Sequence, residues 1–195
     1  ADQQTKRGPE GLGHMGINWR RRMNFVIPVR CNDIWSSDEV MTALKNTLCF
    51  LSEHIYQFVF VKATAPVKEM APHFSFTDDN MTPDEIALFS GGVDSLAGAV
   101  EDVVGNGKKM ALVSHHLSPK VFKLQKQLAR EFRKRDLGQQ ALFVPVEVTN
   151  SNVKAKEYTQ RTRSFLFASL AAVVARIYGK TRFTFYENGV ISLNL

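Results

Sequence analysis

The chain has 195 residues, 44% of them hydrophobic and 23% charged, and this composition excludes a generally disordered protein. The length accommodates one ordinary domain, or a small domain and part of another, and lets the chain bury about 70% of its unfolded surface without disulfide or metal support. The formal net charge is +6, and the excess is local, because residues 118–136 carry seven Lys and Arg against two acidic residues. We interpret this segment as the solvated face of an amphipathic helix and expect no nucleic acid partner. A surface for nucleic acid or a partner protein stays open as the alternative.

The two cysteines, Cys31 and Cys49, form no CxxC pair, so we expect no cysteine zinc site within this chain. The sequence contains no run of 18 apolar residues. A transmembrane helix is therefore not predicted, and no membrane partner is expected. The first residues are polar and lack the apolar core of a secretory signal, which favours a cytoplasmic location. We also expect the protein to continue beyond Leu195, because residues 191–195 are largely apolar and end without a cap or a polar tail.

Three segments make up the predicted domain organisation. Residues 1–18 are polar and glycine-rich and are predicted to form a flexible tail. Residues 19–80 are predicted to form a small α+β unit followed by a linker that contains Pro66 and Pro72. Residues 81–195 are predicted to form an α/β domain with a parallel sheet, truncated at its C-terminus.

Two strands are expected to flank one helix in the N-terminal unit. Residues 23–29 and 57–61 are rich in β-branched and aromatic residues, and Pro28 favours an edge position for the first of these strands. Between them, a cap at Ser36 or Ser37 and apolar residues at helical spacing predict a helix from Val40 to Ile55.

Strands and helices alternate through the second half of the chain. Strands are predicted over 85–89, 109–114, 140–148 and 181–186, and helices over 94–104, 119–136 and 161–178. Such alternation indicates βαβ units and a parallel sheet. The inner face of the helix over 119–136 is predicted to consist of Val121, Leu124, Leu128 and Phe132.

One motif joins the first of these strands to the helix that follows it, and it reads Ser90-Gly91-Gly92-Val93-Asp94-Ser95. Glycines let a backbone approach phosphates closely and adopt positive φ, and we expect both glycines to do so. The loop N–H groups, the hydroxyls of Ser90 and Ser95, and the positive end of the helix dipole are expected to surround one anion. At the carboxyl end of a parallel strand, this arrangement predicts a pyrophosphate site.

The motif resembles the SGGxDS signature of the PP-loop ATP pyrophosphatases. The resemblance implies an adenine nucleotide α hydrolase-like fold for residues 81–195, with ATP and Mg²⁺ as cofactors. Enzymes of this family cleave ATP between the α and β phosphates, adenylate a substrate oxygen, and let a nitrogen or sulfur nucleophile displace AMP. By this resemblance, Asp94 would also hold Mg²⁺ and act in catalysis, and its structural alternative is a helix N-cap. The nucleotide-binding residues implied by the motif are Ser90, Gly91, Gly92, Val93, Asp94 and Ser95.

Two later stretches narrow the resemblance. Residues 161–172 are similar to the R-N-x-x-F-x-x-x-A-A helix of the 7-cyano-7-deazaguanine synthases (QueC), and residues 186–194 resemble more closely the QueC-like proteins of bacterial anti-phage operons, the QatC type. The resemblance implies a ligase that adenylates a deazapurine-type carboxylate for amide or nitrile formation in anti-phage defence, with partner proteins from the same operon. QueC enzymes also carry a four-cysteine zinc site, which could lie only beyond this chain.

Four further residues are assigned to the nucleotide site. His115 follows a predicted strand at its carboxyl end, and a solvated loop residue is an equal alternative. Arg163 lies at the start of a predicted helix, where a cation opposes the dipole, so we expect it to meet a phosphate and act in catalysis rather than be merely solvated. Glu187 and Asn188 follow the last predicted strand, and an ordinary Asn-Gly turn is the alternative.

Two other functions stay open at this point. One is a different PP-loop enzyme, an amidotransferase or a tRNA-thiolating relative, which would need a catalytic cysteine or a glutaminase partner. The other is a nucleotide-sensing scaffold in a defence complex. Release of pyrophosphate from ATP, with and without a carboxylated deazapurine, separates these functions.

Overall fold

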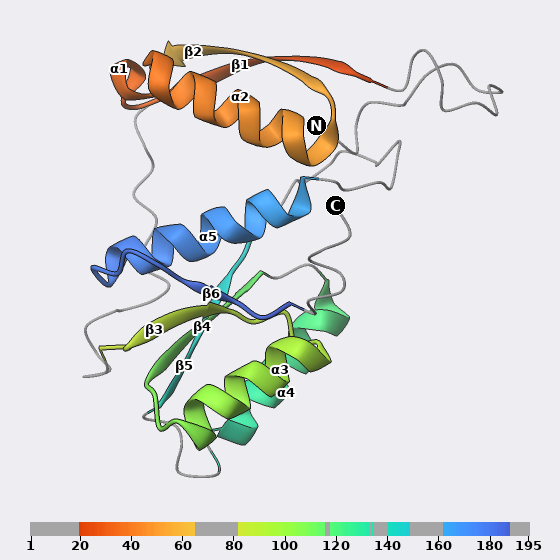
Figure 1. The fold of residues 1–195 in the computed structure, drawn as a ribbon, viewed down its shortest axis with the longest axis vertical. Coiled ribbons are helices and arrows are strands. Elements are labelled where there is room, and N and C mark those ends of the chain that lie inside the picture. The colour runs from red at the N-terminus through yellow and green to blue at the C-terminus, as the bar shows by residue number, and fades with distance from the viewer. Residues whose placement is uncertain are drawn as a thin grey trace, which may run out of the picture. The chain divides into compact units, whose positions relative to one another are not determined.

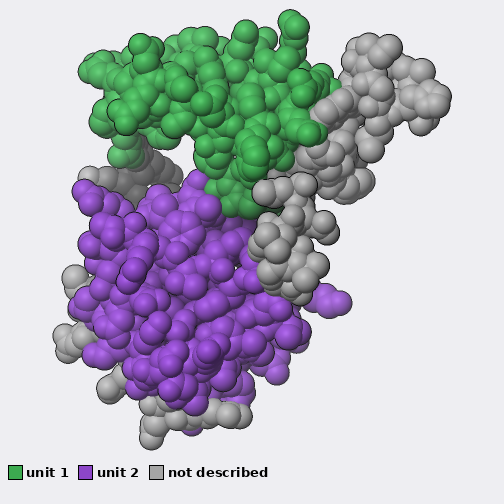
Figure 2. Space-filling model, in the orientation of Figure 1, with its two compact units in different colours: residues 1–73, 151–165 green, residues 74–150, 166–195 purple. Residues whose placement is uncertain are grey.

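The computed structural model describes residues 20–64, 82–115, 118–132, 134, 140–148 and 162–187. The chain divides into two compact units, residues 1–73 with 151–165 and residues 74–150 with 166–195, which Figure 2 shows in different colours. The described residues combine helices with parallel sheets, which confirms the α/β class at this level. None of the helices in the described ranges is long and apolar enough to cross a membrane.

The first unit has a β-α-β arrangement. Its elements, in chain order, are β1 (Arg22–Val29), α1 (Asn32–Trp35), α2 (Asp38–Ser52) and β2 (Ile55–Lys62). The two strands pair in parallel along their whole length, from Arg22 with Ile55 to Val29 with Lys62. The predicted α+β unit is therefore, in its described part, a parallel strand pair joined through helices (Figure 1).

The end of α2 differs from the prediction. Ser37 caps the helix as expected, with its hydroxyl accepting from the N–H of Val40. The helix stops at Ser52, because Glu53 adopts a left-handed conformation with φ 58°. The prediction that this helix runs to Ile55 was wrong, since Ile55 opens β2 and continues the alternating pattern of that strand.

Every second residue of the two strands faces the helices. The core of this unit consists of Met23, Leu48, Tyr56, Phe58 and Phe60. The residues between them point to the other face of the sheet, where Val26 and Val59 are 70% and 57% exposed. The period of two in β2 thus separates a buried aromatic face from an exposed β-branched face.

The second unit is built on a four-stranded parallel sheet with the order β5-β4-β3-β6. Its elements are β3 (Glu85–Leu88), α3 (Val93–Val100), a π-helical turn (Glu101–Gly105), β4 (Met110–His115), α4 (Pro119–Phe132), β5 (Ala141–Val146), α5 (Arg163–Ile177) and β6 (Thr184–Phe185). All seven strand and helix predictions for this half are found, with shorter bounds at most ends.

The strand order creates a topological switch point beside β3. The chain moves from β3 through β4 to β5 in one direction and then returns to place β6 on the opposite side of β3. The helices divide accordingly (Figure 1). Ala99, Val103 and Phe132 from α3, the π-helical turn and α4 pack on one face of the sheet, while Val174 and Ala175 of α5 pack on the other. In open parallel sheets, ligands bind beyond the carboxyl ends of the strands at such a switch point.

A polar network joins β6 to the π-helical turn. The hydroxyl of Tyr186 donates to Oδ2 of Asp102 at 2.5 Å, and Lys108 Nζ lies 2.9 Å from Asp102 and 3.2 Å from Glu85. The hydrogen bond from Tyr186, followed by those from Lys108 and Asn106, holds the pKa of Asp102 below its ordinary value. Burial, and then the hydrogen bond to Asp102, raise the pKa of Tyr186.

Candidate functional site

The Ser90–Ser95 loop leaves the sheet at the switch point. The strand before it is buried, and the N–H of Phe89 still pairs with the carbonyl of Val113 at 2.8 Å. At Ser90 the chain turns away from the sheet into solvent, and α3 begins three residues later at Val93. The motif therefore lies at the place in this fold where a ligand is expected.

Hydroxyl groups hold the loop in its conformation. The N–H of Gly91 donates to Oγ of Ser95, and the N–H of Gly92 donates to Oγ of Ser90, both at 3.2 Å. The two hydroxyls lie 3.0 Å apart, and Oγ of Ser95 also donates to the carbonyl of Gly92 at 3.0 Å. Ser95 is buried while Ser90 is exposed. In this structure the hydroxyls and both glycine N–H groups are used to shape the loop.

Only one of the two glycines has a positive φ. Gly91 has φ +82°, a conformation that side chains with a Cβ rarely adopt. Gly92 has φ −78° and serves as the N-cap of α3, so the expectation of positive φ at Gly92 was wrong. An added Cβ at Gly92 would approach only Oγ of Ser90, at 3.4 Å, whereas one at Gly91 would stand 3.1 Å from Cγ of Gln125.

The start of α3 faces solvent beside the loop. Asp94 lies in the first turn of the helix and is exposed, and since Gly92 is the N-cap, the capping alternative for Asp94 is wrong. Val93 is 83% exposed, an unusual position for a branched apolar residue. The N–H groups of a first helical turn have no partner within the helix, so this turn offers donors to an anion.

Gln125 is a residue of this region that the sequence analysis did not find. The predicted inner face of α4 included Leu124, which is 46% exposed, whereas Gln125 is 1% exposed. The carboxamide of Gln125 donates from Nε2 to the carbonyl of Ser90 at 3.0 Å and to that of His115 at 3.5 Å. The helical spacing of the apolar residues favoured Leu124 as the buried residue. The buried position is in fact the next one along the helix, where the sequence has a polar residue.

Two other predicted site residues lie at the same edge of the sheet. His115 ends β4, and its ring stands 5.5 Å from the ring of Phe167 on α5. Glu187 is exposed and follows β6 by two residues. Because β4, β3 and β6 are adjacent and parallel, the structure brings His115, the loop and Glu187 to the carboxyl ends of three neighbouring strands.

The other two predicted site residues are Arg163 and Asn188. Arg163 is exposed at the first position of α5 and is grouped with the first unit, whereas the loop belongs to the second. Asn188 lies outside the described residues. Their roles in the nucleotide site stay predictions.

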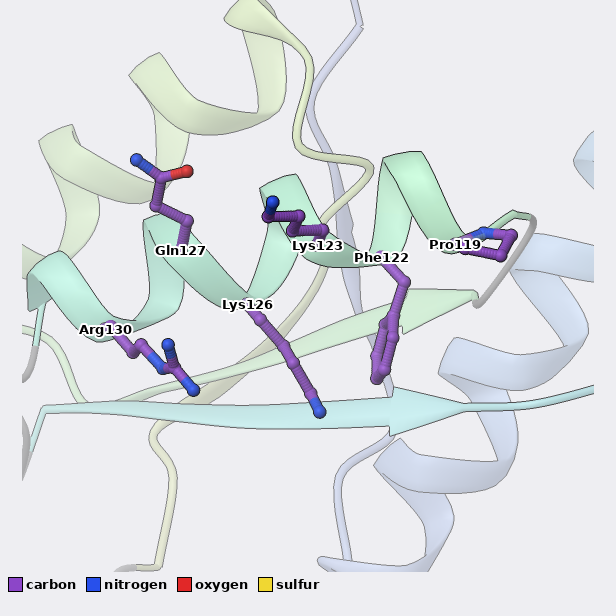
Figure 3. A pocket seen from close by; sticks show the side chains of 6 residues that line it. All are labelled: Pro119, Phe122, Lys123, Lys126, Gln127 and Arg130. Carbon is purple, nitrogen blue, oxygen red and sulfur yellow. The ribbon is translucent and has the colours of Figure 1, made fainter.

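The outer face of α4 carries the basic segment. A pocket of about 460 Å³ lies along this helix, and Figure 3 shows its lining side chains, Pro119, Phe122, Lys123, Lys126, Gln127 and Arg130. Nζ of Lys126 stands 4.5 Å from the centre of the Phe122 ring. The basic side chains of α4 are exposed, as a solvated face requires. A surface for nucleic acid or a protein stays the alternative.

The loop region offers groups that suit phosphate with Mg²⁺. The outer side of Gly92 is open, the first turn of α3 presents N–H groups, and Asp94 supplies a hard carboxylate oxygen. One carboxylate together with phosphate oxygens and water is a common way to hold Mg²⁺ beside a nucleotide. Across the described ranges, no three His, Cys, Asp or Glu side chains gather in a group that could hold a metal ion by themselves.

Comparison of the chain with protein-family models, with curated proteins and with solved structures found no match.

Proposed function

We propose that the chain is an ATP-dependent enzyme of the PP-loop pyrophosphatase type, QueC-like, that adenylates a deazapurine-type carboxylate for amide or nitrile formation and acts in the cytoplasm in anti-phage defence. The observation that carries the proposal is the position of the SGGVDS loop. It follows a buried parallel strand, precedes a helix, and lies at the topological switch point of the sheet.

The geometry supports a division of roles among the residues. Gly91, in its left-handed conformation, turns the chain so that α3 begins at Val93 and directs its first N–H groups outward. These groups would receive the pyrophosphate part of ATP, and Asp94 would hold Mg²⁺ against it. The Ser90 and Ser95 hydroxyls keep the loop in shape rather than serving first as ligands.

The reaction proposed for this site forms one bond to the α-phosphorus of ATP and breaks another. A carboxylate oxygen of the acceptor attacks the α-phosphorus of ATP, the bond to the bridging oxygen breaks, and pyrophosphate leaves. The negative charge that develops on the leaving pyrophosphate would be stabilised by the N–H groups and the dipole of α3. Among the remaining predicted residues, His115 and Glu187 lie at the strand ends where the acceptor would be expected.

The experiment that tests this function measures pyrophosphate release from Mg-ATP, with and without a 7-carboxy-7-deazapurine. Stimulation of pyrophosphate release by the carboxylate is the expected result, and AMP should form when ammonium is added, because ammonia displaces AMP from the acyl adenylate to give the amide. A chain that binds ATP and releases no pyrophosphate with any carboxylate or amine would instead be the nucleotide-binding scaffold. Release that depends on tRNA would point to the thiolating relatives.

A further inference from the structure

The inner face of α4 places one polar side chain against the loop. Gln125 is 1% exposed and lies between Val121 and Leu128, which are partly buried, and close to Ala129, which is buried. The side chains around it on this helix face are apolar, so its amide has to find partners on the sheet and the loop. It finds them where two strands end.

The amide of Gln125 bridges the ends of β3 and β4. Nε2 donates to the carbonyl of Ser90 at 3.0 Å and to the carbonyl of His115 at 3.5 Å. Ser90 follows the end of β3, and His115 is the last residue of β4, so the amide donates to backbone carbonyls at the ends of two neighbouring strands. Oγ of Ser114 serves the preceding carbonyl, that of Phe89, in the same way, at 2.6 Å.

The stem of Gln125 occupies the space beside Gly91. Its Cγ stands 3.1 Å from the point where a Cβ on Gly91 would be, and Leu128 Cδ1 lies 3.9 Å from the same point. The chain turns with φ +82° at this glycine. Gln125 thus meets the loop in two ways, through a hydrogen bond to Ser90 and through a stem that fills the space where a Cβ on Gly91 would stand.

The amide oxygen of Gln125, Oε1, gives no reason for a glutamine at this position, so the reason must lie with the donor. Oε1 of Gln125 is buried and accepts no hydrogen bond from the residues that the structure describes. An apolar side chain of equal length would fill the space without leaving a buried acceptor unpaired. The donor on Nε2, which two backbone carbonyls share, is what such a side chain could not provide.

We propose that Gln125 is a positioning residue of the loop: it ties the ends of β3 and β4 together and holds Gly91 in the conformation that presents the start of α3 to a phosphate ligand. The inference rests on the proposed function for the identity of that ligand, ATP. The effect of Gln125 on the loop itself does not depend on ATP.

Three variants separate the parts of this side chain. Gln125→Met keeps the length and the apolar stem and removes the donor. Gln125→Glu keeps the shape and places a carboxylate oxygen opposite the two carbonyls. Gln127→Met is the matched control, because it changes the same residue type on an exposed face of the same helix.

The first measurement is hydrogen exchange and carbonyl ¹³C chemical shifts by NMR in the protein without nucleotide. In Gln125→Met, the amides of Gly91 and Gly92 should exchange about tenfold faster, since a buried hydrogen bond is lost. The carbonyl shifts of Ser90 and His115 should change, while the amides of Ala111 and Leu112 in β4 keep their protection. Gln127→Met should leave all of these signals as they are in the wild type.

The second measurement is a pH profile that a merely structural role would not produce. In Gln125→Glu, protonation of the carboxyl group restores a donor, so protection of the loop amides should recover as the pH is lowered through the pKa of that group. Gln125→Met should show no such recovery.

The third measurement is the calorimetric affinity for Mg-ATP, which should fall about tenfold in Gln125→Met and be unchanged in Gln127→Met. Unchanged loop exchange in Gln125→Met would overturn the inference, and so would an equal loss of protection in β4, which would make Gln125 a general core residue. If the loop amides respond as expected but the wild type does not bind ATP, the proposed function fails and the positioning role stands.

Discussion

The ring of Tyr186 lies against the backbone of Gly98, where an added Cβ would stand 2.1 Å from Cδ1 of that ring. The absence of a side chain at Gly98 lets the tyrosine cross α3 and reach Asp102 with its hydroxyl. The strand after α5 is thereby connected to the helix that follows the loop. This contact fixes Tyr186, the residue directly before Glu187.

Gly98→Ala should lower the free energy of unfolding by about 1–3 kcal/mol, because the ring must shift and its hydrogen bond to Asp102 is lost. Denaturant unfolding monitored by circular dichroism measures this loss of stability. The control is Gly105→Ala, where a Cβ would meet nothing within 4 Å, and it should be neutral or stabilising by up to about 1 kcal/mol. Equal stability of the two variants would contradict the packing described for Tyr186.

The hydrogen-bonded pair of Asp102 and Tyr186 should make the free energy of unfolding depend on pH in both the acidic and the alkaline range. The pKa of Asp102 is lowered in the folded chain, so its contribution is complete above the ordinary carboxyl value of 3.8 and is lost as the pH falls through the folded pKa. The pKa of Tyr186 is raised, so its contribution is complete below the ordinary value of 10.0 and is lost as the pH rises above it.

Unfolding curves recorded across the pH range, together with an ultraviolet titration of tyrosinate, measure both effects. Tyr186→Phe should cost about 1.5 kcal/mol at neutral pH, since a hydrogen bond to a charged group is lost, and should reduce the alkaline dependence. Asp102→Asn should bring the pKa of Tyr186 closer to its ordinary value. An unaltered tyrosinate titration in Asp102→Asn would show that the hydrogen bond is not formed in solution.

The sequence predicted the alternation of the second half because each strand there is a short apolar run and each helix has a continuous stripe. It did not predict the strand order, because return of the chain to the far side of β3 is decided by packing between distant segments. The helix end at Ser52 was missed for a local reason, since a glutamate rarely adopts the left-handed conformation that Glu53 has.

The site was predictable only as far as its motif. Gly-Gly between a strand and a helix predicted the turn, but the sequence could not tell which glycine has positive φ, because both residues permit it. Nor could it find Gln125, because the carbonyls of Ser90 and His115, to which its amide donates, come together beside α4 only in the folded chain.

Gly91→Ala and Gly92→Ala should differ although the residues are neighbours. An alanine at position 91 would have to adopt φ +82° and stand 3.1 Å from Gln125, so it should cost about 1–2 kcal/mol and weaken binding of ATP. An alanine at position 92 fits φ −78° and should leave the free energy of unfolding within about 0.5 kcal/mol of the wild type. Thermal unfolding compares them, and a reversed order would refute the assigned glycine conformations.

Asp94→Ala should leave the fold intact, because the side chain is exposed in the first turn of α3. If Asp94 holds Mg²⁺ beside phosphate, the affinity for ATP should lose most of its dependence on Mg²⁺ in this variant. Asp84→Ala, a change at another exposed aspartate, is the control and should keep that dependence. Calorimetric titrations with ATP in the presence of Mg²⁺ and of EDTA measure the difference.

The most direct measurement is a pair of calorimetric titrations of the chain with Mg-ATP and with AMP. The N–H groups at the start of α3 should contact the β and γ phosphates that AMP lacks, and each charge-assisted hydrogen bond contributes about 1.5–3 kcal/mol before ordering costs. ATP should therefore bind at least about tenfold more tightly than AMP, and Gly92→Val, which places a branched side chain on the open side of the loop, should remove this preference. Equal affinities for ATP and AMP, unchanged in Gly92→Val, would contradict a pyrophosphate site at residues 90–95.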